Sequence, residues 1–393
     1  MLFKFGPLRP KGSLTNVLVL VVVTALVVPF TVAGFQTVTP LSPIPGHDTP
    51  GVDDSPGRVV AVTAVPGGHD PGPWKIARDA EITISLAGDV LLDTNALPHL
   101  SLEGWRQTWT TIAPVFGATD YALVNLECPV ADCGQPIPDK KFLFRASPDS
   151  LEGLVAAGVN LVTIANNHIL DYGREALLAT VQNLDHYGIR FCGAGADRAA
   201  AWQPLEITGN GLRGAILAFS QVVPAGWAAG DNTAGIASAY EIEDMLETVA
   251  AAAAGYDFVL VSLHWGQERA ASPSPAQQEL ATRLLAAGAM AVVGHHPHVL
   301  QGIQATDGRL VAYSLGNLVF TAPDGSVIDG AVLQLGIGAE GINWARVVPL
   351  AVAPGFAQPL QDSAAVDALA RITCLSAAWD TAINPEGYVL FRQ

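Results

Sequence analysis

Short apolar runs alternate with segments of helical periodicity along most of the chain after residue 79. The runs are nearly continuous in aliphatic residues, which is typical of strands buried on both faces. The predicted strands are Ile82–Leu86, Tyr121–Leu126, Asn160–Ala165, Ile189–Cys192, Ala215–Phe219, Phe258–Leu263 and Ala289–Val293. Strands that alternate with helices predict an α/β fold, in which helices cover the faces of a sheet.

The segments between these runs carry signals for the start and end of helices. Ser147 is placed to cap one helix, with Pro148 at its first position and Gly158 beyond its end. A second signal is Gly288, which stops the last predicted helix. The other predicted helices are Gly173–His186, Ile242–Ala254 and Ala276–Ala287.

After residue 298 the pattern changes to β-hairpins. Asp307 and Gly308 form a typical two-residue turn between two apolar runs. The predicted pairs are Val299–Gln304 with Leu310–Tyr313, and Ala331–Ile337 with Ile342–Val348. The segment from Pro354 onward is rich in Ala and Pro, and its sequence indicates no site.

The N-terminus carries a membrane signal. Lys4, Arg9 and Lys11 precede an uncharged apolar run over 17–35, which would span about 28 Å as a helix, close to the thickness of the hydrocarbon layer. A cleaved signal peptide is the alternative, with small residues at 31–33 near a cleavage site. We favour an uncleaved anchor because the run is longer than a signal-peptide core, so we expect a single-pass cell-membrane protein whose bulk is extracytoplasmic.

These patterns divide the chain into five parts. The segment after the anchor is rich in Pro and Gly and has little periodicity, which is typical of a linker. The predicted parts are a cytoplasmic tail at 1–16, a transmembrane signal anchor or signal peptide at 17–35, a linker at 36–80, an α/β domain at 81–350 and a C-terminal tail at 351–393.

Composition narrows the class of protein. A hydrophobic content of 50% is enough for a large core, and a net charge of -16 opposes binding to nucleic acid. Export would permit disulfides, and Cys128 and Cys133 are near enough in sequence to close a small loop, although free thiols are equally consistent. Their spacing is not that of a zinc-binding CxxC pair.

Polar residues follow several of the predicted strands. Parallel strands gather such residues at one edge of a sheet, where functional groups converge. The residues in question are Asp89, Glu127, Asn167, His264, His296 and His298. Carboxylate, amide and imidazole ligands together suit Mn, Fe or Zn better than Ca or Mg.

Each of these residues alone has a structural explanation. A Gly-Asp pair after a strand is usually a turn or cap, the Asn166-Asn167-His168 run suits a plain loop, and a single His264 is often a hydrogen-bonded core residue. The His296-Pro297-His298 run is harder to explain structurally, because both rings can turn toward one point. The order of the polar residues that follow the strands favours a functional site over these structural explanations. The order is acid, acid, Asn-His, His and His-x-His.

Six motifs closely resemble those of the CapA-type poly-gamma-glutamate capsule biosynthesis proteins, within the calcineurin-like metallophosphoesterase superfamily. They are GDVLLD (88–93), NLECPV (125–130), ANNHILDYG (165–173), HWGQE (264–268), GHHPHVLQG (294–302) and YSLGNLVF (313–320). The resemblance covers about residues 81–320 and keeps the order of the family. It implies a layered α/β/β/α sandwich with C-terminal β-hairpins.

The resemblance also implies roles for individual residues. The implied metal ligands are Asp89, Glu127, Asn167, His264, His296 and His298, with Asn125 as a further member, and they would hold one or two divalent transition metals. His168 is the implied acid, which supplies a proton during metal-dependent attack on an electrophilic centre. Asp171 and Glu268 are candidates for orienting the ligand histidines, and Tyr313 and Asn317 for lining the substrate pocket.

One departure from the superfamily concerns its first motif, which usually reads Asp-x-His. Here Leu91 stands where the imidazole is expected, which puts the second metal and ordinary phosphatase activity in doubt. His295 falls where the family usually has a small residue, so we expect it to be incidental. Pro297 is expected to hold the His-Pro-His loop in one conformation.

Three functions are consistent with these observations. The first is a membrane-anchored, metal-dependent hydrolase or transferase that acts on poly-gamma-glutamate or another envelope polymer, alongside membrane synthase or export partners. The second is a non-catalytic module that binds polymer or synthase on a degenerate metallophosphoesterase fold. The third is a generic metal-dependent phosphoesterase.

Overall fold

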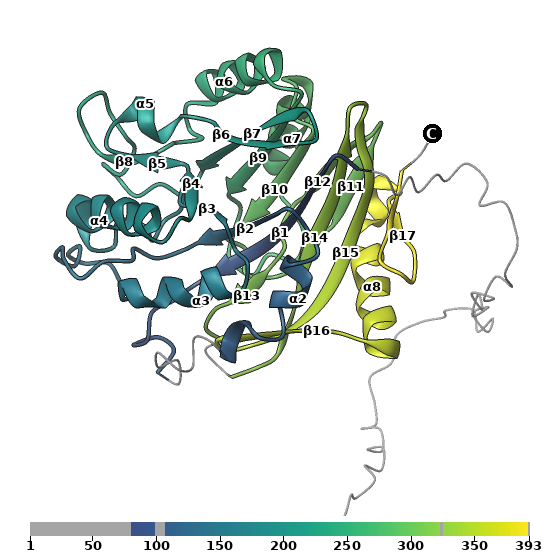
Figure 1. The fold of residues 1–393 in the computed structure, drawn as a ribbon, viewed down its shortest axis with the longest axis horizontal. Helices are drawn as coiled ribbons and strands as arrows, with labels where there is room; N and C mark the ends of the chain where they lie inside the picture. Colours follow the sequence, from purple (N-terminus) through teal and green to yellow (C-terminus); the bar gives the residue numbers. More distant parts are fainter. Residues whose placement is uncertain (1–79, 99–106, 323–324, 392–393) are drawn as a thin grey trace, which may run out of the picture. The chain divides into compact units, whose positions relative to one another are not determined.

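The computed structural model describes residues 80–98, 107–322 and 325–391 (Figure 1). The predicted tail at 1–16, the anchor at 17–35 and nearly all of the linker at 36–80 lie outside the described residues. Within the described part of the chain, no helix combines the length and hydropathy needed to cross a membrane.

An eight-stranded mixed sheet, the larger sheet, contains the first strand of the domain near its centre. Its order is β16 (Phe356–Pro359), β15 (Gly341–Ala353), β14 (Ile328–Gly338), β1 (Ile82–Val90), β2 (Tyr121–Leu126), β3 (Leu161–Thr163) and β4 (Arg190–Cys192), and β13 (Asn317–Val319) also pairs with β1. The strands from β1 to β4 are parallel, whereas β14, β15 and β16 are antiparallel.

A six-stranded sheet, the smaller sheet, packs against the larger one. Its order is β11 (Ile303–Thr306), β12 (Arg309–Ala312), β10 (Ala291–His295), β9 (Phe258–His264), β7 (Leu212–Ser220) and β6 (Leu205–Gly209). The four central strands are parallel, and the two edge strands are antiparallel to their neighbours. Two-stranded pairs are formed by β5 (Ala194–Gly195) with β8 (Gly235–Ile236) and by β17 (Ala382–Ile383) with β18 (Val389–Leu390).

Helices cover the outer faces of the two sheets, except for the C-terminal helix, which closes one side of the core between them (Figure 1). They are α2 (Ala113–Phe116), α3 (Leu151–Ala156), α4 (Gly173–His186), α5 (Arg198–Ala201), α6 (Ile242–Gly255), α7 (Pro275–Ala286) and α8 (Asp362–Ser376), with 3-10 turns η1 (Pro148–Ser150) and η2 (Ala377–Trp379). The boundaries of α4 agree with the predicted helix, and those of α6 and α7 differ from the prediction by one residue.

Alternating side chains along the strands build three apolar layers. On β1, Ile84 and Leu86 face a core between the sheets, while Val90 belongs to a core that α3 and α4 cover. On β9, Leu260 faces the inter-sheet core, while Val261 packs beneath α6 and α7. The predicted layered α/β/β/α sandwich with C-terminal β-hairpins is therefore confirmed.

One local prediction differs from the structure, one hairpin was missed, and the structure decides between the two alternatives left open for the cysteines. Ser147 precedes the 3-10 turn η1, but its side chain makes no capping hydrogen bond; the Ser150 hydroxyl donates to the Ser147 carbonyl at 2.7 Å. The hairpin formed by β6 and β7 was not expected, although Asn210 and Gly211 are typical turn residues. A cross-link between Cys128 and Cys133 is absent, and all four cysteines are free thiols.

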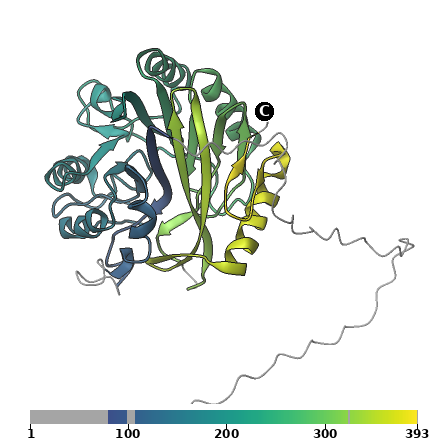
Figure 2. The same ribbon diagram turned by 45° about the vertical axis from the view of Figure 1, so that its right-hand side comes forward.

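The C-terminal segment is part of the packed structure. The predicted boundary at 351 falls within β15, and β16 extends the larger sheet beyond it. Helix α8 runs beside the β14–β15 hairpin and contacts β15 of the larger sheet and β11 of the smaller one (Figures 1 and 2). Leu369 and Ile372 of this helix belong to the inter-sheet core, so α8 closes one side of it.

Candidate metal centre

The candidate site lies where parallel strands of both sheets end. Asp89 is near the end of β1 and pairs in register with Asn125 of β2, and Glu127 follows β2 directly. His264 ends β9 and pairs in register with His295, which ends β10. The two sheets thus present carboxylates from one side and imidazoles from the other at a shared edge.

A strained turn directs the histidines after β10. His296 and His298 have φ values of 94° and 57°, in the left-handed region that non-glycine residues rarely adopt. The backbone N–H of His296 donates to Asp89 Oδ2 at 3.1 Å, which ties the turn to β1. At Gly294 a Cβ would lie 1.9 Å from the Tyr313 carbonyl oxygen, so only glycine permits this close approach.

The two buried carboxylates face the imidazole rings. Asp89 lies 3.2 Å from Nδ1 of His295 and 3.2 Å from Nδ1 of His298. Glu127 Oε1 lies 3.5 Å from His264 Nε2 and 3.9 Å from His298 Nε2. Two groups of ligand atoms within 4.8 Å of one another result: Asp89, Glu127 and His264, and Glu127, His296 and His298.

Several ligand atoms of this cluster are buried without a hydrogen-bond partner among the described residues. They are Glu127 Oε1, both ring nitrogens of His295 and Nδ1 of His296. A buried carboxylate oxygen without a donor costs free energy unless a cation compensates it. Oxygen and nitrogen donors of this kind suit a divalent transition metal, so the residues fit the predicted cofactor.

Two asparagines complete the centre. Asn125 Nδ2 donates to Asp89 Oδ1 at 2.9 Å, and its own Oδ1 accepts from Asn166 Nδ2 at 3.2 Å. Asn167 Oδ1 lies 2.9 Å from His264 Nε2. The structure therefore brings Asn125 and Asn167 to the carboxylates and histidines of the candidate site. Asn166, which the sequence did not single out, is buried and fixes this loop through Oδ1, which accepts from the His168 and Ile169 N–H groups.

Burial and neighbouring charges shift the pKa values of the two carboxylates in opposite directions. Burial raises the pKa of Glu127 well above its usual value, and the Asp89 carboxylate raises it further. Burial alone would also raise the pKa of Asp89, but the His295 and His298 rings outweigh it and hold that pKa well below its usual value. Asp89 is thus the ionised acid of the pair.

The pKa values of the candidate ligand histidines also shift in opposite directions. Burial and the neighbouring His296 lower the pKa of His264 well below its usual value, and burial and His298 lower the pKa of His296 to about 4. Burial would lower the pKa of His298, but the Glu127 and Asp89 carboxylates raise it to about 9. His264 and His296 are therefore neutral imidazoles, the form that binds metal.

The predicted acid, His168, has a separate set of partners beside the metal cluster. Its Nδ1 lies 2.8 Å from Asp171 Oδ2, which also accepts the Phe144 N–H at 2.8 Å. The Lys140 ammonium donates to Asp171 Oδ1 and to the Asn167 carbonyl. Burial lowers the pKa of His168 and that of Lys140, although Asp171 opposes both shifts. Asp171 therefore orients His168 rather than a ligand histidine.

A cavity of about 280 Å³ opens beside His168 and His298. Its apolar wall includes Phe144, whose ring centroid is 4.6 Å from that of His168, and Phe320, 4.5 Å from His298. Glu268, Arg269 and Asn317 also line this cavity, and Asn317 Oδ1 lies 2.9 Å from His298 Nδ1. The sequence candidates Glu268 and Asn317 thus lie at the cavity.

Tyr313 lies elsewhere. It is fully buried, stacks between Trp265 and Trp379, and its hydroxyl donates to Gln304 Oε1 at 2.8 Å. It packs beneath the helices of the smaller sheet and does not line the cavity.

Besides Asn166, two residues of the site were not expected from the sequence. His295 was expected to be incidental, but its buried ring places Nδ1 3.2 Å from Asp89 Oδ1, and its Nε2 has no hydrogen-bond partner among the described residues. Lys140 was not identified, because it lies in an irregular segment without any motif. Leu91 is fully buried in the apolar layer beneath α3 and α4, so this position supplies no metal ligand.

Comparisons with known proteins identify the family of this chain. The model of the family described as bacterial capsule synthesis protein PGA_cap matches residues 83–322. The PGA biosynthesis protein CapA of Bacillus subtilis is 30% identical over 73% of this chain and 76% of its own. A probable polyglutamine synthesis accessory protein of Mycobacterium tuberculosis is 34% identical over 55% of this chain and 60% of its own.

Among solved structures, an NAD nucleotidase of Haemophilus influenzae is similar to this chain. It is 14% identical, with a TM-score of 0.41, over 74% of this chain and 62% of its own.

Proposed function

We propose that this chain, which belongs to the bacterial capsule synthesis protein family PGA_cap, is a metal-dependent hydrolase or transferase that acts on an envelope polymer. The polymer that we propose is poly-gamma-glutamate, and the names of this chain's relatives support that choice. The chain would act as an accessory to a membrane synthase or exporter, as the name of the mycobacterial relative suggests for that protein.

One observation carries the catalytic part of the proposal. Glu127 belongs to both groups of candidate ligands, is fully buried, and has one carboxylate oxygen without a hydrogen-bond partner among the described residues. A buried acid next to a second acid is unfavourable unless a cation lies between them. A site of this kind supports metal binding better than it supports a purely structural role.

The residues that would hold metal are Asp89, Glu127, His264, His296 and His298, with Asn167 and His295 beside them. A bound divalent cation would supply Lewis-acid polarisation and a more acidic water. The protein contributes orientation and proton transfer. Asp171 fixes Nδ1 of His168, which leaves Nε2 as the atom that transfers a proton to the leaving group. The Phe144 and Phe320 rings limit water around the reacting bond.

The location that we propose is the outer face of the cell membrane. It rests on the basic residues before position 17 and on the apolar run over 17–35. The test is protease accessibility of a C-terminal epitope in intact spheroplasts. Digestion of the epitope in intact cells is expected, and full protection there with digestion after lysis would contradict this location.

The catalytic role is tested with His168→Ala in polymer-producing cells. We expect polymer processing to be lost at normal protein levels, with the metal content of the purified variant unchanged. His186→Ala, a substitution at an exposed position at the end of α4, serves as the matched control. Normal polymer in the His168→Ala strain would contradict a catalytic role.

A non-catalytic polymer-binding or synthase-binding module is the second candidate function. The observation that favours it is Leu91, a buried leucine where the superfamily usually supplies an imidazole. The two functions differ in metal content. Less than about one tenth of an equivalent of transition metal in the purified full chain would favour the binding module over the enzyme.

A further inference from the structure

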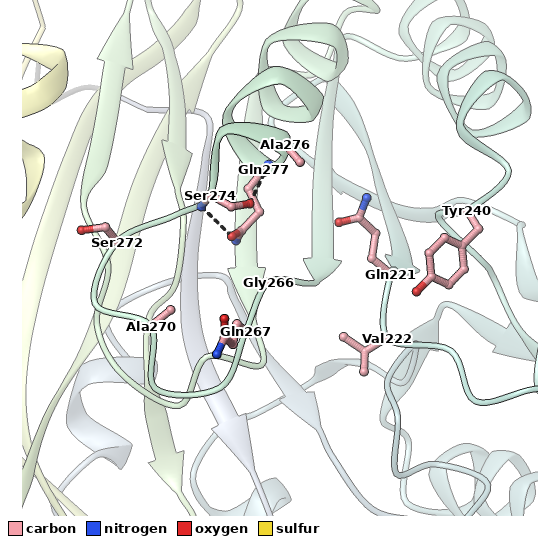
Figure 3. A pocket seen from close by; sticks show the side chains of 10 residues that line it. All are labelled: Gln221, Val222, Tyr240, Gly266, Gln267, Ala270, Ser272, Ser274, Ala276 and Gln277. Atoms are coloured by element: carbon pink, nitrogen blue, oxygen red, sulfur yellow. Dashed lines mark hydrogen bonds between the residues drawn. The ribbon is translucent and has the colours of Figure 1, made fainter.

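A second pocket lies on the smaller sheet, on the other side of the loop that follows His264. Its volume is about 400 Å³, and its polar lining residues are Gln221, Tyr240, Gln267, Ser272, Ser274 and Gln277. Figure 3 shows Gln221 and Tyr240 on one side of this amide pocket, and Gln267 and Gln277 on the other. No charged side chain lines it.

One donor in the amide pocket is unsatisfied. Gln277 is 3% exposed, and its Nε2 has no hydrogen-bond partner among the described residues. Its Oε1 accepts the Ser274 N–H at 3.0 Å in the capping box of α7, which fixes the orientation of the amide. Gly266 lies against Nε2, since a Cβ there would be 2.7 Å away. The wall of the pocket therefore contains a buried N–H group that requires an acceptor.

The amide pocket is connected to the candidate metal centre through the backbone. The Gln221 N–H donates to the His264 carbonyl at 2.8 Å. Gln267 lines the amide pocket, and the next residues, Glu268 and Arg269, line the cavity beside His168. The Arg269 N–H donates at 2.7 Å to the carbonyl of Pro297, between the two ligand histidines. One short loop thus forms a wall of both pockets.

We propose that the amide pocket is a binding subsite for the amide backbone of a polyamide substrate, next to the unit that reacts at the metal centre. This inference rests on the proposed function for its choice of polymer. The chemistry of the lining supports it, because carboxamides and hydroxyls pair with the carbonyl and N–H of an amide. A lining without cations offers a carboxylate no opposite charge to offset its loss of hydration, so we expect the carboxylates of a γ-glutamyl chain to stay in solvent.

The test is binding of a γ-linked glutamate pentamer to the full chain, measured by equilibrium dialysis at constant salt. A polyacrylate with the same number of carboxylates is the control ligand, because it carries the charge without amides. Gln277→Met and Gln221→Met each replace a carboxamide with an apolar side chain of similar length. Each is expected to weaken pentamer binding about three- to tenfold. Tyr240→Phe, at an exposed position, tests the lining without any risk to the core.

Gln278→Met is the matched control variant, since Gln278 lies next in α7 but does not line the pocket. It should bind the pentamer as the wild type does, and polyacrylate binding should be equal in all variants. Unchanged pentamer binding by both Gln221→Met and Gln277→Met would overturn the subsite. So would an equal loss of polyacrylate binding, because it would mean that the variants act through charge or folding.

Binding is measured with and without a chelator, so it does not depend on turnover. A pentamer that binds through these glutamines without being processed would contradict the proposed enzyme and leave the subsite intact. A pentamer that is processed normally by the Gln221→Met and Gln277→Met variants, with unchanged binding, would leave the enzyme intact and remove the subsite.

Discussion

The candidate metal cluster (Asp89, Glu127, His264, His295, His296 and His298) and the neighbouring His168 group (Lys140, His168 and Asp171) are both largely buried and charged, but they differ in how their polar atoms are satisfied. In the cluster, Glu127 and His295 retain ligand atoms without hydrogen-bond partners among the described residues. In the His168 group, each oxygen of the Asp171 carboxylate accepts a hydrogen bond, from Lys140, from the Phe144 N–H or from the His168 ring.

This difference separates two functions within one edge of the fold. Polar atoms without partners favour a ligand that arrives from outside, whereas satisfied ones fix a side chain in place. We therefore expect substitutions in the cluster to change metal binding, and substitutions around His168 to change turnover and stability while metal binding persists.

The largest effect is expected for Glu127→Gln. Loss of the shared carboxylate should reduce bound metal to well below half an equivalent and slow polymer processing at least about 100-fold. In the metal-free protein the same change should raise the melting temperature, because the raised pKa of Glu127 means that the native state disfavours its charge. Metal analysis and thermal unfolding with chelator measure the two effects. Metal content equal to that of the wild type would contradict the ligand role.

Asp171→Asn is expected to have the next largest effect. It leaves the Lys140 ammonium without its buried carboxylate and replaces one of the two acceptor oxygens of Asp171 with an NH2 donor, which disturbs the orientation of His168. Turnover should therefore fall about 100-fold and the free energy of unfolding by about 3 kcal/mol. Metal content should not change. Asp329→Asn, at an exposed pair with Arg371, is the control and should have little effect on either quantity. A loss of metal in Asp171→Asn would remove the distinction between the two regions.

His295→Gln tests the imidazole that the sequence did not identify. We expect a metal affinity about tenfold weaker, with the wild-type fold retained, because Gln keeps a polar group beside Asp89 while removing the ring nitrogens. Competition with a chelating dye measures the affinity. An unchanged affinity would mean that His295 only neutralises Asp89.

The smallest effect is expected for Lys140→Met. Asp171 keeps the Phe144 N–H and the His168 ring as partners, so turnover should fall only about tenfold and metal content should remain. Lys141→Met, at the neighbouring position, is the control. Equal turnover in Lys140→Met and the wild type would show that the ammonium does not help to position His168.

The sequence predicted most of the fold because the central strands are continuous apolar runs. The β14–β15 hairpin and helix α4 followed from the same periodicity. The C-terminal helix α8 was missed because its Ala-rich sequence has weak periodicity, and its place depends on contacts with β11 and β15 that are distant in sequence. The apolar segment over 17–35 stays a prediction.

The sequence predicted the site residues that directly follow strands. It failed for residues whose role depends on which face of a strand their side chains point to. The strand that was predicted to end at Val293 extends to His295. Residues two apart in a strand point to the same face, so the His295 ring faces the inter-sheet side, as Val293 does, and lies beside Asp89. The same rule places Tyr313 with Val311 on the outer face, away from the cavity. The position of Lys140 depends on a long irregular segment, which no local pattern determines.

Anomalous diffraction from crystals of the protein soaked with manganese or zinc tests the central claim most directly. We predict a peak at about 2.0–2.3 Å from a Glu127 oxygen and from a ring nitrogen of His264, His296 or His298. No peak within this cluster, under conditions where the ion binds elsewhere on the protein, would contradict the metal centre and the enzymatic function that depends on it.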